Sequence, residues 1–317
     1  MTTTVVAPPT SATNPYVDSL QRAARVNWRL EDIIGADRRL DFNKRFLPDL
    51  LARVDRIGCL DGREKRILNQ IRGNSYLHLF ALAEEFILPA VLGQVSEGGT
   101  ADITATQALL HFAEEESKHI RLFRRFAEAF EAGFGSPCDV IGPVPQIAAA
   151  VLQHSPLGVM FATLLLEWAT QHHYLASVQG NDAEDLDPQF CSLLRHHWLE
   201  EAQHADLDTL VLQRMAGELD SDAIRTGADD FFRIVDLLEG GLREQVGLDL
   251  TSFTRATVRV LDAAEIEAVT SCQRDSYLWT FLGSGLSHPR FQETFAQVCP
   301  DHLPRLREAS ARYGGAA

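Results

Sequence analysis

The sequence predicts an all-α protein, with a four-helix bundle at its core and additional helices flanking it. Apolar residues recur at helical spacing over long segments, and clusters of glycine, proline or asparagine separate these segments. No alternating apolar runs of strand type compete with this pattern. With 317 residues, of which 45% are hydrophobic, the chain is long enough to bury a large core.

Clusters of glycine, proline or asparagine mark where the expected helices end. They are Gly98–Gly99, the segment 133–145, Asn181–Asp182 and Gly240–Gly241. The expected helices are 15–29, 61–95, 101–132, 146–178, 186–217, 221–245, 248–275 and 287–312. We expect one domain over residues 15–317, with the bundle at about 61–217. Residues 1–14 are expected to be a disordered lead, because they have no basic region followed by an apolar core, as a signal peptide has.

The first bundle helix carries an acidic pair, Glu84 and Glu85, inside the apolar stretch LHLFALAEEFILPAVL. A buried carboxylate without a partner is costly, so it usually changes its protonation or finds a cation. Apolar residues flank both faces of this helix. Periodicity therefore leaves the choice between the two glutamates open.

The second bundle helix carries Glu-x-x-His, from Glu116 to His119. Residues three apart on a helix are separated by roughly 60° around the axis, so the carboxylate and the imidazole project together. Glu116 shares a face with Phe123. Its neighbour Glu115 is expected to lie on a solvated face.

The third bundle helix carries a lone Glu167 in MFATLLLEWATQHHYL, and the fourth repeats the Glu-x-x-His spacing from Glu201 to His204. Glu200 lies about 100° away from Glu201, so Glu201 is the expected ligand. The order lone Glu, Glu-x-x-His, lone Glu, Glu-x-x-His is what a four-helix site for two iron or manganese ions requires. It also indicates a duplicated helical hairpin.

His197 distinguishes this chain from a generic di-metal bundle. It lies one helical turn before Glu201 in HHWLEEAQH, and positions 197, 201 and 204 fall within about 60° of arc. His197 can therefore reach the same metal cluster as a seventh protein ligand. Spacing alone leaves open a packed or outer role.

The stretch from His197 to His204 resembles the His-x-x-x-Glu-x-x-His signature of p-aminobenzoate N-oxygenase-type di-iron enzymes, in the ferritin-like superfamily. In that family the extra histidine is an iron ligand, and the family's first helix, lined up with EEFILPAVL, favours Glu85. The resemblance covers roughly residues 60–215. It implies the ligand set Glu85, Glu116, His119, Glu167, His197, Glu201 and His204.

Carboxylate and imidazole ligands suit iron or manganese better than softer metals. The resemblance implies two iron ions, O2 as co-substrate, an external electron-donor protein or reductant, and a small-molecule amine. The amine nitrogen would be oxygenated to a hydroxylamine, nitroso or nitro group, in secondary metabolism. The alternatives are a carbon-directed hydroxylase or desaturase and, more remotely, a ferritin-like iron-oxidising protein.

Charge and cysteine content exclude other classes. The net charge of -15 argues against binding to nucleic acid or to an anionic membrane. The five cysteines are scattered and never spaced as Cys-x-x-Cys, which argues against a disulfide framework or a zinc knuckle. We expect a cytoplasmic enzyme, and the sequence leaves a homodimer open.

Overall fold

The computed structural model describes residues 14–35 and 37–314, so residues 1–13 of the expected disordered lead lie outside the described residues. The described residues form helices joined by short connections, and no strand occurs among them. The predicted all-α class is thereby confirmed.

Four long helices carry the centre of the molecule. They are α4 (Gly62–Gly98), α5 (Ile103–Phe134), α7 (Pro156–Ser177) and α8 (Pro188–Glu218). α4 packs along α5, and α7 packs along α8, so the bundle consists of two helical hairpins. Its first helix starts at a capping box, in which Asp61 and Glu64 each accept a hydrogen bond from the other's backbone N–H. These four helices match the predicted bundle closely.

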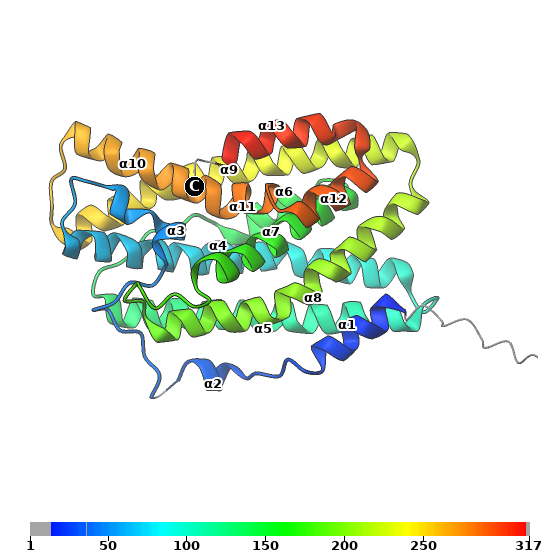
Figure 1. Cartoon of the computed structure of the whole chain (residues 1–317), viewed down its shortest axis with the longest axis horizontal. Coiled ribbons are helices and arrows are strands. Elements are labelled where there is room, and N and C mark those ends of the chain that lie inside the picture. Colours follow the sequence, from blue (N-terminus) through cyan, green and yellow to red (C-terminus); the bar gives the residue numbers. More distant parts are fainter. Residues whose placement is uncertain (1–13, 36, 315–317) are drawn as a thin grey trace, which may run out of the picture.

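Shorter and later elements cover the bundle (Figure 1). α9 and α10 lie on one side, and α1 and α2 lie along α5 and α8 on another. The remaining elements are α1 (Pro15–Ala23), α2 (Leu30–Ile33), α3 (Asp49–Ala52), η1 (Val54–Arg56), α6 (Val144–Leu152), α9 (Ser221–Thr257), α10 (Ala263–Leu278), the π-helical η2 (Trp279–Gly283), α11 (Ser284–Leu286), α12 (Pro289–Val298), η3 (Pro300–His302) and α13 (Leu303–Tyr313).

Several predicted helix boundaries are wrong: helix 15–29 ends at Ala23, helix 248–275 begins only at Ala263, and helix 287–312 is divided into α12 and α13. The glycine pair at 240 and 241 does not end a helix, because α9 runs for 37 residues through it and buries Leu242, Val246 and Phe253 beyond it. Conversely, the predicted helix 146–178 is divided into α6 and α7. Pro156 starts α7, and Asp230 on α9 accepts a hydrogen bond from the Ser155 N–H at 2.9 Å.

α4 continues through Pro89 to Gly98. By length and composition alone it is the one helix of the described residues that could span a membrane. The core helix of a bundle passes the same test, and α4 packs against α5, α7 and α9. Its packing makes it the central helix of the fold.

Candidate metal centre

Acidic and histidine side chains from all four bundle helices meet in the middle of the bundle. Each of them is at most 2% exposed, so the cluster is isolated from solvent. The members are Glu84 from α4, Glu116 and His119 from α5, Glu167 from α7, and His197, Glu201 and His204 from α8.

The structure corrects the choice of Glu85. Its side chain is 31% exposed and forms an ion pair with Arg124 on α5, whereas Glu84 points into the cluster. Adjacent helical residues differ by 100° in direction, so only one of the pair can face the centre. Because α4 is buried on more than one face, its apolar pattern did not identify which glutamate that is.

Two glutamates lie between the histidines. Oε1 of Glu201 is 3.0 Å from Nε2 of His197, 3.1 Å from Nδ1 of His119 and 3.5 Å from Nδ1 of His204. Glu116 lies 2.8 Å from Nδ1 of His204 and 3.5 Å from Nδ1 of His119. Both carboxylates can therefore serve two metal positions at once.

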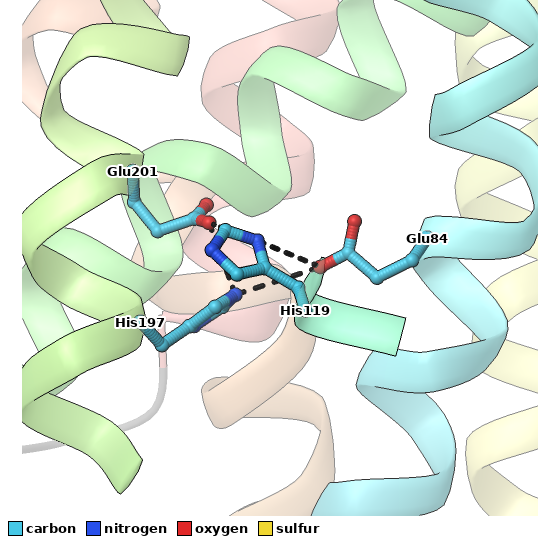
Figure 2. Close-up of side chains that lie close together, drawn as sticks. All are labelled: Glu84, His119, His197 and Glu201. Atoms are coloured by element: carbon cyan, nitrogen blue, oxygen red, sulfur yellow. Dashed lines mark ion pairs between the residues drawn. The ribbon is translucent and has the colours of Figure 1, made fainter. Parts of the chain in front are cut away.

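The other two glutamates lie at opposite ends of the cluster. Oε1 of Glu84 is 3.5 Å from Nε2 of His197 and 3.9 Å from Nδ1 of His119, and Figure 2 shows these side chains converging with Glu201 on one point. Oε2 of Glu167 is 4.0 Å from Nδ1 of His204. The cluster thus has a side with His119 and His197 and a side with His204.

The atoms that face the middle of the cluster have no hydrogen-bond partner within the described part of the chain. They are Oε2 of Glu84, both carboxylate oxygens of Glu116, Nδ1 of His119, Oε2 of Glu167, Nε2 of His197, Oε1 of Glu201 and Nδ1 of His204. Buried polar atoms are normally paired, so a convergent set of unpaired oxygen and nitrogen donors fits metal ions.

Two further glutamates orient the histidines from outside, and the sequence did not reveal them. Nε2 of His119 lies 2.9 Å from Glu200 Oε2, and Nε2 of His204 lies 2.9 Å from Glu115 Oε2. An ionised carboxylate only accepts hydrogen bonds, so each Nε2–H donates and each Nδ1 presents its lone pair inward. Glu115 is 1% exposed, so its predicted solvated position is wrong. The Glu-Glu pair that precedes each histidine is the sequence signal that could have identified these two outer glutamates.

Protons balance the carboxylates in the metal-free protein. Burial raises the pKa of Glu84 well above its ordinary value, and repulsion from Glu116 adds to the rise. Burial likewise raises the pKa of Glu167. Burial would lower the pKa of His119, but its close contact with Glu116 and its hydrogen bond with Glu200 outweigh burial and raise that pKa to about 10. Cations would replace these protons.

The walls of the cluster are mostly aromatic. Phe80 and Phe123 pack edge-on against His197, with ring centroids 5.7 and 4.9 Å away, and Phe112 stacks on His204 at 4.1 Å. Behind Phe80, a cavity of about 50 Å³ is enclosed by apolar side chains of α4, α6, α7, α9 and η2. Phe80 lines this cavity and also packs against His197, so the cavity and the cluster lie on opposite sides of its ring.

No family model matches this sequence, and no curated protein matches it. Among solved structures, a variant R2-like ligand-binding oxidase with an anaerobically reconstituted Mn/Fe cofactor superposes with a TM-score of 0.50, at 14% identity over 89% of this chain and 95% of that chain. A second variant, also with a Mn/Fe cofactor, has a TM-score of 0.49 at 14% identity over 86% and 93% of the two chains. At such low identity the first likeness shows the helical fold alone.

Proposed function

We propose that this protein is an O2-dependent di-iron oxygenase of the ferritin-like kind that oxygenates an amine nitrogen. The observation that carries the proposal is the convergence of unpaired donor atoms from seven buried side chains, with two of the histidines fixed from outside by carboxylates. An ordinary bundle core has no use for such a set, because unpaired buried carboxylates destabilise it.

The ligand set divides into two positions. Glu84, His119 and His197 would hold one ion, Glu167 and His204 would hold the other, and Glu116 and Glu201 would lie between them. Two bound irons would supply the redox chemistry with O2, with electrons from an external donor. Manganese in one position is the alternative, since the R2-like oxidase that superposes with a TM-score of 0.50 carries Mn/Fe.

The chain's own residues control access and protons. The aromatic walls exclude water, and Glu115 and Glu200 hold the two histidines in the tautomer that can bind metal. The preference for nitrogen as the oxidised atom rests on the resemblance of the His197 motif to the N-oxygenases.

One observation favours a second candidate, a carbon-directed di-iron oxidase. The cavity beside the cluster is lined by Leu79, Leu82, Phe86, Leu166 and other apolar residues, and offers no polar side chain to an amino group. A small hydrocarbon group fits such a lining better than an amine does, because the lining gives the amino group no side-chain hydrogen-bond partner. Location in the cytoplasm and a homodimer stay predictions.

The test is single-turnover chemistry. The protein is loaded anaerobically with Fe²⁺, its iron content is measured, and it is mixed with ¹⁸O2 in the presence of either an aryl amine or an apolar hydrocarbon. Label on the amine nitrogen supports the N-oxygenase, and label on carbon supports the second candidate. A protein that binds no iron refutes both. The His197→Ala variant should lose iron or change the product.

A further inference from the structure

The outer partners of the two histidines repeat almost perfectly between the two halves of the bundle. Residues 115–119 read Glu-Glu-Ser-Lys-His on α5, and residues 200–204 read Glu-Glu-Ala-Gln-His on α8. In each copy the side chain of the first glutamate extends to the other helix and accepts a hydrogen bond from the histidine of the other copy. The two motifs are therefore related by an approximate two-fold axis.

The residue before each histidine also donates a hydrogen bond to the glutamate on the facing helix. Nε2 of Gln203 donates to the two oxygens of Glu115 at 3.0 and 2.9 Å, and Nζ of Lys118 donates to Glu200. Each glutamate thus receives two donors from the facing helix, one from the histidine and one from its predecessor. The contacts are equivalent, but one predecessor is charged and the other is neutral.

This single charge breaks the symmetry. The ammonium of Lys118 compensates Glu200 and is held by the ring of Trp28, whose centroid is 4.0 Å from Nζ. The amide of Gln203 leaves the charge of Glu115 uncompensated. His111 comes within 3.4 Å of Glu115, but its Nδ1 makes no hydrogen bond within the described residues.

The ligands inside the cluster differ in number between the two sides but not in charge. The side oriented by Glu200 has two imidazole ligands, those of His119 and His197, whereas the side oriented by Glu115 has only that of His204. Each side has one glutamate of its own. Among the described side chains, those around His204 carry about one more negative charge than those around His119, because only Glu200 is paired with a lysine.

We infer that Lys118 and Gln203 make the two metal positions unequal, so that the position beside His204 takes the first divalent ion and the position beside His119 takes the second. This inference rests on the proposed di-metal site and goes beyond it, because it assigns an order of occupation. Lys118 and Gln203 are positioning residues that act through the carboxylates they contact.

The experiment measures stepwise binding of Mn²⁺ without O2, with free Mn²⁺ counted from its EPR signal. We expect two resolved steps in the natural protein. Lys118→Gln should tighten the weaker step by about tenfold and leave the stronger step unchanged, while Gln203→Lys should weaken the stronger step by about tenfold. Lys44→Gln removes a lysine that pairs with Asp185 away from the cluster, and should change neither step.

The possible results separate this inference from the proposed function. If two ions bind but neither affinity changes in the two variants, or both affinities change by the same factor, the inference is overturned and the di-metal site stands. No bound Mn²⁺ or Fe²⁺ in the natural protein refutes the site itself. If Lys118→Gln fails to fold by circular dichroism, Lys118→Met keeps the packing on Trp28, removes the charge, and must produce the same tightening.

Discussion

The acidic pair of α4 shows how far single residues could be read from the sequence. The Glu-x-x-His spacing identified Glu116, His119, Glu201 and His204, which the structure brings together. The spacing left the choice between Glu84 and its neighbour open, because the helix is surrounded by apolar groups, and the family resemblance favoured Glu85. Outer partners such as Glu200 were missed, because they contact the histidine of the facing helix and the repeated Glu-Glu pair does not by itself show that contact.

Neighbouring substitutions on α4 test the register of the cluster. Glu84→Gln keeps the size of the side chain but removes a charged ligand, and should lower metal affinity by more than the roughly 10- to 100-fold typical for an outer partner. Glu85→Gln breaks only an exposed ion pair with Arg124, which is worth about 0–1 kcal/mol, and should leave metal binding intact. Iron per chain after dialysis measures both. Equal iron loss in both variants would contradict this assignment.

Metal binding should release protons. Glu84 and Glu167 have raised pKa values because they are buried, and contacts with glutamates raise the pKa of His119 to about 10, so all three groups bind protons more tightly than free side chains do. The incoming ions displace them, and affinity should therefore rise as pH rises. We expect protons to be released when the metal binds, as measured by calorimetry in buffers of different ionisation enthalpy. A binding heat that does not depend on the buffer would contradict this.

Helix boundaries depended on contacts that the sequence does not display. Gly240 and Gly241 resemble a helix end, but α9 continues because its next turns bury Leu242 and Val246 against the bundle. The break between α6 and α7 is stabilised by Asp230, which lies far away in the sequence. Local propensity therefore predicted which helices exist better than where they end.

The approach of α11 to α7 gives a test of helix packing. A Cβ atom at Gly285 would lie 2.3 Å from the carbonyl oxygen of Leu165, two residues before Glu167. Gly285→Ala should force the two elements apart, lower stability by about 1–3 kcal/mol and weaken metal binding. Gly247→Ala, with no atom within 4 Å, should be neutral or stabilising by up to about 1 kcal/mol. Urea unfolding compares them, and equal midpoints would disprove the close approach.

The whole molecule brings its proposed ligands together from helices that begin at Gly62 and end at Glu218. The bundle could be predicted because its four helices are long, separated by clear breakers and marked in order by acidic residues. The covering by the N-terminal segment could not be predicted, because the contact of Trp28 with His119 depends on how an irregular stretch crosses α5.

Metal should stabilise the entire fold, because the ions would join all four bundle helices. At a free-metal concentration of about 100 times Kd, the gain is about 2.7 kcal/mol. This gain should raise Tm by about 5 °C or more. Differential scanning calorimetry with and without Fe²⁺, under argon, measures the shift. The Glu84→Gln variant is the control, and a shift of equal size in it would mean that the metal binds elsewhere.

The crossed contacts between α5 and α8 also limit how this chain can diverge. A replacement of Glu115 leaves Gln203 and His204 without their acceptor, although both belong to the other hairpin. Tolerated changes should therefore arrive as pairs across the hairpins, Lys118 with Glu200 and Gln203 with Glu115. Although the sequence resembles a duplication, a substitution in one copy should require a compensating substitution in the other.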